Sequence, residues 1–240
     1  MSSTNTEIPL QGYDEEQIRL MEERLILVNE SDQNVGSDTK KNCHLITSQN
    51  EGRLHRAFSV FIFDSQNRLL LQQRAEEKIT FPNYFTNTCC SHPLSFPAEI
   101  DEANQLGVKR AAIRKLEHEL GITKDQIPID NIKYLTRILY KSPSDSKWIE
   151  HEMDYILLVK ADVTLNINPN EIKSFRYVTP AELDTLFKDA EATSTKPGSE
   201  KILITPWFRL IYNNFLLDWW KNIDNIHSIS QDDTIHNMIK

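Results

Sequence analysis

Two neighbouring segments predict a β-hairpin, so any fold of this 240-residue chain must contain a sheet. Residues 57–63 alternate well enough for a strand, residues 64–67 have turn chemistry, and residues 69–74 form the returning strand. A second hairpin is predicted upstream, where the strand 25–28 is followed by a turn at 31–36 and a return toward His44. Residues 134–140 and 153–159 predict further strands, separated by the polar loop 141–147.

Three helices are expected around these strands. A short acidic helix is predicted at 14–24, and a longer one at 102–120, where apolar residues recur at helical spacing and Gly121 is a stop signal. The polar face of the longer helix is predicted to carry Lys109, Arg110, Arg114 and Lys115. A third helix should begin at Thr205-Pro206 and continue to Trp220. The pattern predicts an α+β fold with a mixed sheet covered on both faces.

Composition limits the class of protein and its partners. With 26% charged and 39% hydrophobic residues, the chain is typical of a soluble globular protein of one large domain. Its net charge of -8 argues against nucleic-acid or anionic-membrane binding. The longest aliphatic run, 156–159, is too short for a membrane span. Three cysteines, two of them adjacent, indicate free thiols and a cytoplasmic location, with a peroxisomal one left open although no targeting tripeptide is visible.

A cysteine stands two residues before a histidine in the polar segment 86–93. If this segment is extended, Cys90 and His92 point to the same side, because successive side chains alternate along a strand. A thiol and an imidazole would then share one wall of a cavity. The alternative is that Cys89 and Cys90 are small buried residues and His92 is a turn histidine.

A second group of polar residues precedes the strand 153–159. Strand alternation places Glu150 and Glu152 on one face, where two carboxylates are tolerated if a cation lies between them, if one is protonated, or if both face water. His44, His55 and His92 would complete a set of nitrogen and oxygen donors that suits Zn²⁺ or Mn²⁺. Sequence spacing does not show that these residues meet, and a solvated pair of glutamates is the alternative.

Basic residues are concentrated between positions 40 and 78. This window has seven Lys or Arg against four acids, a local charge of +3 in a chain of -8. A cationic cavity lining of this kind suits a small phosphorylated ligand, whereas a solvated hairpin edge protected by charge is the alternative.

Six segments together resemble type I isopentenyl-diphosphate delta-isomerases of the eukaryotic form: 55–60, 70–74, 78–82, 86–93, 148–154 and 205–208. The resemblance covers residues 25–221 and implies a Nudix-like fold. Residues 114–122 resemble the end of the Nudix box, but Lys115 and His118 occupy positions of its glutamates, and Ile100 and Leu106 replace its upstream glycine and glutamate. Loss of these carboxylates, with Glu119 retained, fits an isomerase better than a hydrolase.

The resemblance implies conversion of isopentenyl diphosphate to dimethylallyl diphosphate through a tertiary carbocation. The alkene is protonated at its terminal methylene, and a proton is then lost from C2. Glu152, supported by Tyr140, is expected to protonate the alkene and Cys90 to act as the base, and the reverse reaction exchanges these roles. Cys89 is expected to be structural.

The resemblance also implies two kinds of metal ion and a diphosphate site. Zn²⁺ or Mn²⁺ is expected at His44, His55, His92, Glu150 and Glu152. Glu119 is expected to bind a Mg²⁺ ion that bridges to the diphosphate. The diphosphate itself is expected to contact Lys40, Arg74, Lys78 and Ser91. Trp207 is expected to face the carbocation, with simple core packing as the alternative.

The chain is expected to have three parts, and two other functions are left open. Residues 1–13 are expected to be a flexible N-terminus, 14–221 a single isomerase domain, and 222–240 an extension that is either a loose tail or a poorly patterned helix. The protein should act on a small isoprenoid diphosphate as a monomer or weak dimer. A Nudix hydrolase would instead release phosphate or nucleotide, and a non-catalytic relative would be expected to lack Cys90 or Glu152, both of which are present.

Overall fold

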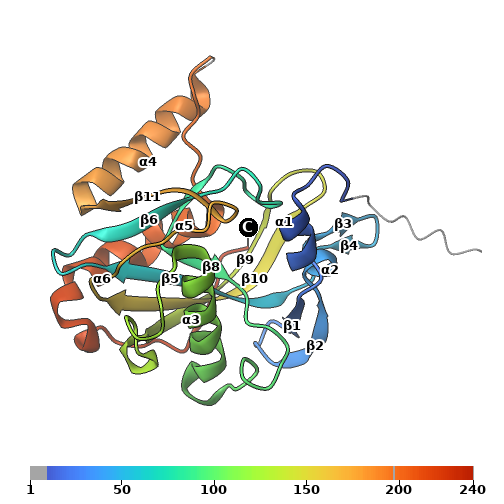
Figure 1. Ribbon diagram of the computed structural model, residues 1–240, viewed down its shortest axis with the longest axis horizontal. Helices are drawn as coiled ribbons and strands as arrows, with labels where there is room; N and C mark the ends of the chain where they lie inside the picture. The colour runs from blue at the N-terminus through green and yellow to red at the C-terminus, as the bar shows by residue number, and fades with distance from the viewer. Residues whose placement is uncertain (1–9, 197, 240) are drawn as a thin grey trace, which may run out of the picture.

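A mixed ten-stranded sheet runs through the computed structural model, which describes residues 10–196 and 198–239 (Figure 1). Its main path is β11 (Ile172–Val178), β6 (Leu69–Arg74), β5 (His55–Phe63), β10 (Ile149–Lys160), β9 (Lys133–Pro143) and β12 (Ile235–Asn237). At its sides lie β1 (Arg24–Val28), β2 (Asn34–Thr39), β7 (Phe85–Thr86) and β8 (Cys89–Ser91). A separate small sheet pairs β3 (Ile46–Thr47) with β4 (Asn50–Glu51).

Helices cover both faces of the central strands. All nine residues of β5 are buried, and they alternate between two cores. Phe61 packs in the core that contains residues of α4 (Pro180–Thr195), α5 (Pro206–Ile211) and α6 (Leu217–Lys221), whereas Val60 packs in the core that contains α3 (Leu106–Leu120). Because β5 and β10 are parallel while β9 and β10 are antiparallel, the predicted α+β fold with a mixed sheet between helices is confirmed.

Both predicted hairpins and the two later strands are present. β1 pairs with β2 and β5 with β6, each antiparallel. The predicted strands 134–140 and 153–159 are parts of the longer β9 and β10. The return toward His44 differs: the strand ends at Thr39, whose hydroxyl caps a short helix, α2 (Lys40–His44). This helix points Lys40 and His44 toward the site described below.

The helix boundaries differ from the predicted ones for local reasons. α1 (Glu15–Leu20) begins after Asp14, whose carboxylate accepts backbone N–H groups, and ends early because the strand β1 begins at Arg24. α3 begins at Leu106 rather than 102, because Asn104 and Gln105 are in the left-handed region. Gly121 ends α3 at φ +67, and a Cβ there would lie 2.6 Å from the Asn166 carbonyl oxygen.

The second half of the chain contains elements that the sequence patterns do not predict. α4 begins with a capping box between Thr179 and Glu182, with proline at its first position, and follows β11 directly. The helix predicted from Thr205 onward is divided into α5, a π-helical turn (Tyr212–Leu216) and α6. None of the helices in residues 10–196 and 198–239 is long and apolar enough to cross a membrane.

The two chain ends are bound to the body of the protein where they are described. The expectation of a loose tail or a poorly patterned helix after residue 221 is only partly met: residues Ile223–Ser228 form a 3-10 helix, but β12 then pairs in parallel with β9. Of the expected flexible N-terminus, residues 1–9 lie outside the described residues. Leu10 and Tyr13 pack against the small core that contains Trp148, and the Trp148 indole nitrogen donates to the Tyr13 hydroxyl at 3.1 Å.

Asp32, in the turn between β1 and β2, connects this turn to three strands of the sheet. Its buried carboxylate accepts from Arg56 Nε at 3.0 Å, from Arg137 Nη1 at 2.6 Å and from the Tyr155 hydroxyl. Arg137 also donates to the carbonyl oxygen of Asp233 at 2.7 Å. One buried carboxylate therefore holds the turn against strands β5, β9 and β10, and its partner Arg137 also binds the C-terminal segment.

We expect Asp32→Asn to lower the free energy of unfolding by about 3–5 kcal/mol, because it leaves two arginines without their buried counter-ion. Asparagine tolerates the positive φ of 61 at this position, so the loss would reflect charge rather than backbone strain. Urea unfolding followed by circular dichroism measures the effect. Asp218→Asn, which removes an exposed pair with Lys221, is the matched control and should change stability by less than about 1 kcal/mol. Equal effects of both substitutions would contradict the prediction.

Candidate functional site

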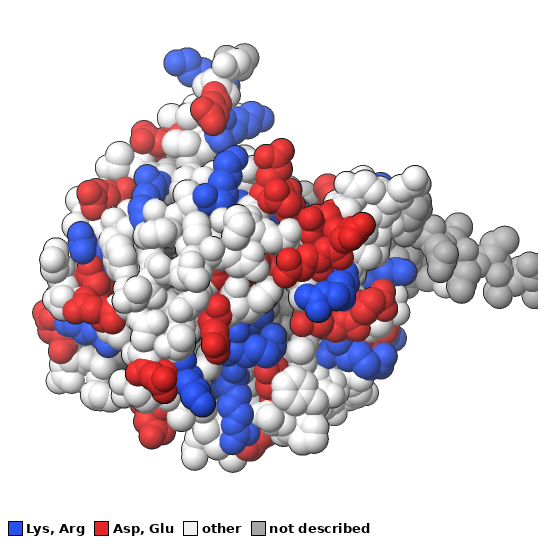
Figure 2. All heavy atoms as spheres, in the orientation of Figure 1, with Lys and Arg blue, Asp and Glu red and all other residues white. Residues whose placement is uncertain are grey.

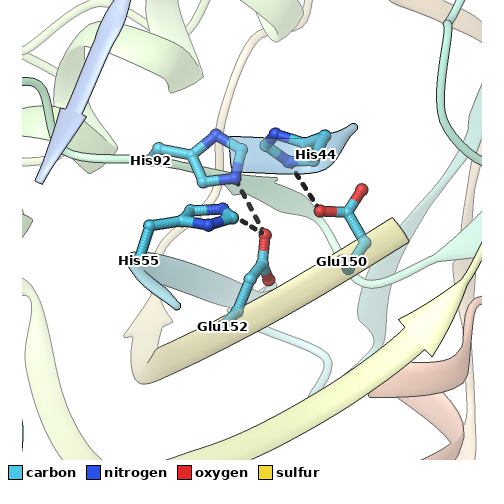
Figure 3. A group of neighbouring side chains, drawn as sticks. All are labelled: His44, His55, His92, Glu150 and Glu152. Carbon is cyan, nitrogen blue, oxygen red and sulfur yellow. Dashed lines mark hydrogen bonds and ion pairs between the residues drawn. The ribbon is translucent and has the colours of Figure 1, made fainter. Parts of the chain in front are cut away.

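Five potential metal ligands from four parts of the chain meet beside the start of β5 (Figure 3). They are His44 of α2, His55 of β5, His92 after β8, and Glu150 and Glu152 of β10. All five are buried, and one ligand atom from each lies within 4.8 Å of all the others. The expected alternation is confirmed, since Glu150 and Glu152 face the cluster while His151 Nδ1 lies 3.0 Å from the Gly52 carbonyl oxygen.

Hydrogen bonds to two of the histidines make their other ring nitrogens suitable for a cation. Nδ1 lies 2.8 Å from the Lys40 carbonyl oxygen in His44 and 2.7 Å from the Arg53 carbonyl oxygen in His55. A carbonyl only accepts, so Nδ1 carries the proton in a neutral ring and Nε2 presents a lone pair. Neither Nε2 has a hydrogen-bond partner among the described residues.

The pair His44–Glu150 shows most directly what this cluster needs. His44 Nε2 lies 2.7 Å from Glu150 Oε2, yet the two buried atoms do not form a hydrogen bond. Two lone pairs at this distance repel each other unless a proton or a metal cation lies between them. Burial, followed by the neighbouring His55 and His44, also lowers the pKa of His92 well below its ordinary value, which favours a neutral ring. The residues therefore fit a divalent metal ion with mixed nitrogen and oxygen ligands.

Glu152 also takes part in a second set of contacts, beside the cluster. Its Oε1 lies 2.8 Å from His92 Nε2, and its Oε2 accepts a hydrogen bond from the Tyr140 hydroxyl. The β9–β10 register places Tyr140 directly opposite Glu152. Burial and the nearby Glu152 raise the pKa of Tyr140 well above its ordinary value, so its hydroxyl keeps its proton.

A small cavity next to the cluster collects most of the predicted site residues. It is lined by Lys40, Arg74, Lys78, Thr80, Cys90, Ser91, His92, Tyr140, Glu150, Glu152 and Trp207. Cys90 and His92 thus line the same cavity, as the alternation predicted. Cys89 points away from it, toward α3, where its Sγ lies 3.5 Å from Glu119 Oε2.

Burial and a nearby positive charge have opposite effects on the pKa of the Cys90 thiol. Burial raises the pKa of Cys90 to about 12, and Arg74 opposes this shift. Arg74 Nη1 lies 3.7 Å from the Cys90 sulfur. Ionisation of this thiol therefore requires cations next to it, and Arg74 is one.

Trp207 closes another side of the cavity. Its indole nitrogen donates to Asn87 Oδ1 at 3.2 Å, and its ring centre lies 6.0 Å from that of Tyr140. The Arg74 guanidinium carbon lies 5.7 Å from the centre of the Trp207 ring. Trp207 is 3% exposed and belongs to the hydrophobic core on one face of β5. The residue therefore packs in the core and also lines the cavity.

The basic window 40–78 contributes only part of its charge to the cavity. Lys40, Arg74 and Lys78 line it. Arg53, Arg56 and Arg68 instead pair with acids elsewhere, namely Asp38, Asp32 with Glu102, and Asp64. On the face drawn in Figure 2, acidic and basic side chains are interspersed rather than separated by sign.

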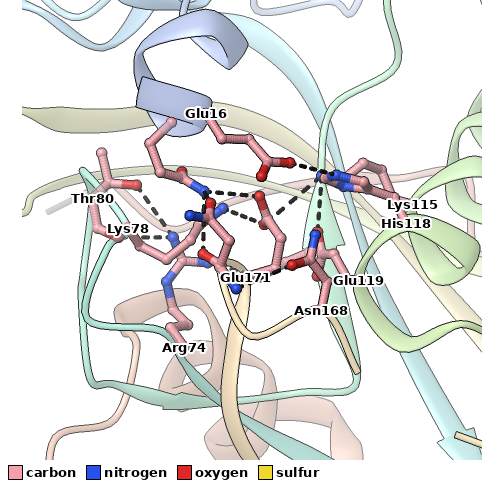
Figure 4. Close-up of polar contacts among 12 residues, drawn as sticks. Glu16, Arg74, Lys78, Thr80, Lys115, His118, Glu119, Asn168 and Glu171 are labelled. Atoms are coloured by element: carbon pink, nitrogen blue, oxygen red, sulfur yellow. Dashed lines mark hydrogen bonds and ion pairs between the residues drawn. The ribbon is translucent and has the colours of Figure 1, made fainter. Parts of the chain in front are cut away.

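A group of buried charges adjoins the cavity through Lys78 (Figure 4). The sequence patterns predict Lys115 to be solvated and give no role to Glu171. Lys115, predicted on the polar face of its helix, is 4% exposed, with Nζ 3.2 Å from Glu119 Oε1 and 3.9 Å from Glu171 Oε2. Glu171 lies just before β11 and pairs with Lys78 at 2.6 Å. No motif marks Glu171, because it precedes a strand that was itself not predicted. Glu119 lies in this group and not in the five-ligand cluster.

Comparison with known proteins assigns the chain to a family. A NUDIX domain model matches residues 53–198. An isopentenyl-diphosphate delta-isomerase 1 of Bos taurus is 53% identical over 232 residues, covering 97% of this chain and 99% of that protein. An isopentenyl-diphosphate delta-isomerase of Schizosaccharomyces pombe is 53% identical over 228 residues, covering 93% and 94%. The chain belongs to the isopentenyl-diphosphate delta-isomerase family.

A solved structure supports the fold of this isopentenyl-diphosphate delta-isomerase family member. A protein of Deinococcus radiodurans matches with a TM-score of 0.52 at 21% identity, covering 81% of this chain and 100% of that one. At this identity the likeness concerns the fold alone. Within the Nudix fold, α3 of this isomerase family member places Lys115 and Glu119 in one buried ion pair.

Proposed function

We propose that this protein interconverts isopentenyl diphosphate and dimethylallyl diphosphate. The observation that carries the proposal is one cavity lined by a thiol, by a carboxylate bonded to a phenol, and by cations suited to a diphosphate. The names of relatives about 50% identical over nearly the whole chain support the same reaction. The substrate class is therefore a small isoprenoid diphosphate.

The proposed chemistry adds one proton to a five-carbon unit and removes another from it. Tyr140 and Glu152 share a hydrogen bond on one side of the cavity, and we assign to this pair the proton that is added to the terminal methylene. The C=C electron pair forms the new C–H bond and leaves a tertiary cation. Cys90 then removes a proton from C2, whose C–H electrons form the new double bond. The reverse reaction exchanges the two roles.

Three further groups would support the charged species of this reaction. Arg74 would stabilise the thiolate form of Cys90. Trp207 would face the cation with its ring and, being buried, would exclude water that quenches carbocations. Lys40, Arg74, Lys78 and Ser91 would bind the diphosphate oxygens by charge-assisted and hydroxyl hydrogen bonds.

We assign Zn²⁺ or Mn²⁺ to His44, His55, His92, Glu150 and Glu152, whose donor atoms fit such an ion. When bound, the ion would neutralise the glutamates and fix the orientation of Glu152. Glu119 is the proposed residue for a Mg²⁺ ion carried by the diphosphate. In the substrate-free protein Lys115 neutralises this carboxylate, so the magnesium ion would have to take the place of that ammonium group.

The proposed compartment follows from the cysteines. Cys43, Cys89 and Cys90 are all free thiols, which supports a reducing compartment such as the cytoplasm.

The test of this function is incubation of the purified protein with isopentenyl diphosphate and magnesium, followed by detection of the acid-labile allylic isomer. The expected result is the allylic diphosphate with no release of phosphate. Release of inorganic phosphate from this substrate or from a nucleoside diphosphate derivative would favour a hydrolase. Binding of the substrate without either product would favour a non-catalytic relative.

Removal of the transition metal is expected to abolish activity and to lower the melting temperature by roughly 4–8 °C, because His44 and Glu150 are left facing each other without a cation. Dialysis against dipicolinate, with metal content measured by mass spectrometry, tests this expectation. Zn²⁺ or Mn²⁺ should restore both activity and melting temperature. Full activity of the metal-free protein in magnesium alone would contradict the assignment.

A further inference from the structure

Glu171 is a buried carboxylate that pairs with a lysine of the cavity (Figure 4). It is 1% exposed and does not itself line the cavity. Lys78 does line the cavity, and its ammonium lies 2.6 Å from Glu171 Oε2. The group that would meet the diphosphate is therefore already engaged by a carboxylate when no substrate is bound.

The contacts of Glu171 hold it firmly in this position. Gln17 of α1 donates to Glu171 Oε1 at 2.9 Å, and the Glu171 backbone carbonyl accepts from Ala75 N at 3.0 Å. Lys115 Nζ lies 3.9 Å from Oε2. Burial raises the pKa of the Glu171 carboxyl, but Lys78 and Lys115 together bring it below its ordinary value, so the group is a carboxylate.

Positive charges outnumber negative ones around this carboxylate. Lys40, Lys78 and Lys115 are close enough that burial and then the other two lysines lower the pKa of Lys40 to about 8. Among the described residues, Glu171 pairs with Lys78 and lies near Lys115, and Glu119 pairs with Lys115. Removal of Glu171 would therefore leave a more positive site beside the cavity, one that binds anions more strongly.

We propose that Glu171 is a positioning residue that holds Lys78 before the substrate arrives and then competes with the diphosphate for this ammonium group. The inference rests on the proposed function, since it takes the ligand of Lys78 to be a diphosphate. Competition of this kind lowers the affinity of the site for substrate and product alike.

Weakened diphosphate binding has a use in an isomerase. Substrate and product carry the same diphosphate, so affinity for that group stabilises both ground states and the transition state equally and does not speed the chemical step. Excess affinity would only retain the product. A carboxylate that takes Lys78 back as the product leaves would promote release without touching the reacting carbons.

The substitution Glu171→Gln separates this role from a structural one. Glutamine has nearly the same shape and can still accept from Lys78, but it carries no charge. If Glu171 only supports the site, its loss should disturb Lys78 and weaken anion binding. If Glu171 competes with the ligand, its loss should strengthen anion binding while the empty protein becomes less stable, because buried lysines then lack a counter-ion.

The experiment is titration calorimetry of the full-length, metal-loaded protein with inorganic diphosphate. We expect E171Q to bind diphosphate about 10-fold more tightly than wild type, the scale of one unit charge acting across several ångströms of protein. Glu16→Gln is the matched control. Glu16 belongs to the same charge network, but it contacts His118, and its side chain is 36% exposed. Its diphosphate affinity should stay within about twofold of wild type.

Steady-state kinetics with isopentenyl diphosphate provide a second readout. We expect E171Q to show a lower KM and a kcat no higher than wild type, whereas loss of support for Lys78 would raise KM. Glu171→Asp keeps the charge but places it one methylene farther from Lys78. It should therefore increase the affinity for diphosphate less than E171Q does. This variant serves as the test if E171Q does not fold.

Three outcomes are distinguishable. Tighter binding in E171Q or E171D, with E16Q unchanged, supports the inference. Unchanged or weaker diphosphate binding in both Glu171 variants, in a protein whose wild type isomerises the substrate, overturns the inference and leaves the proposed function intact. A wild type that binds no diphosphate and forms no isomer overturns both.

Discussion

Replacement of Glu152 by glutamine is expected to lower kcat for isomerisation by about 10⁴-fold or more, at or beyond the upper end of the range for loss of one acid–base group. Glu152 has two roles in the proposed site, and each depends on its charge. Its Oε1 lies within 3.5 Å of ring nitrogens of His55 and His92, whereas its Oε2 accepts from Tyr140. An amide binds a transition metal poorly and offers Tyr140 no carboxylate with which to share a proton.

Glu150→Gln distinguishes the two causes of this loss. Glu150 belongs to the same cluster and lies 2.7 Å from His44, but no hydrogen bond joins it to Tyr140. We therefore expect both variants to bind less metal, measured by mass spectrometry after desalting. With zinc or manganese supplied in excess, E150Q should recover much more activity than E152Q. Equal recovery of both variants would contradict an acid–base role for Glu152.

Replacement of Cys90 by alanine is expected to lower kcat by about 10²–10⁴-fold with the metal content unchanged. Its thiol lines the cavity next to Arg74 and is not one of the five ligands of the metal cluster. Alanine therefore removes the group on one side of the proposed proton transfer and leaves the metal ligands and the diphosphate cations in place. Measurement of kcat together with metal content checks both parts of the prediction.

The adjacent cysteine is the matched control for this prediction. Cys89 is fully buried and points toward Glu119 on the other side of β8. We expect Cys89→Ser to keep most of its turnover, because it changes a buried packing contact and not a cavity-lining group. Comparable losses in C89S and C90A, with both proteins folded by circular dichroism, would contradict this division of roles.

Local patterns are sufficient to predict much of the site. Cys90 and His92 point to the same side of the chain, and so do Glu150 and Glu152. Both facts follow from the two-residue period of an extended chain, which depends only on neighbouring residues. The hairpin 57–74 is likewise predictable, because its turn chemistry and both of its strands lie within 18 consecutive residues. The resemblance to a known family adds the remaining site residues.

Several features are not predictable in this way because they depend on which distant segments pack together. Lys115 has the pattern of a solvated residue on a helix, and its burial is balanced not only by Glu119 of the same helix but also by Glu171, which lies 56 positions later in the sequence. The C-terminal segment has little pattern of its own, and it becomes a strand because β9 presents an unpaired edge. In both cases a partner that is remote in sequence contributes.

By itself, the sequence determined the local elements and the sides to which their polar residues point. Its resemblance to a known family also indicated the reaction. Only the tertiary structure decided that five ligand atoms from four segments meet within 4.8 Å, and that a buried carboxylate engages one of the cavity lysines. The physical reason is the separation along the sequence over which each effect acts. Backbone geometry fixes the direction of a side chain from its immediate neighbours, whereas the cost of a buried charge is met by a partner that the packing of the whole chain brings near.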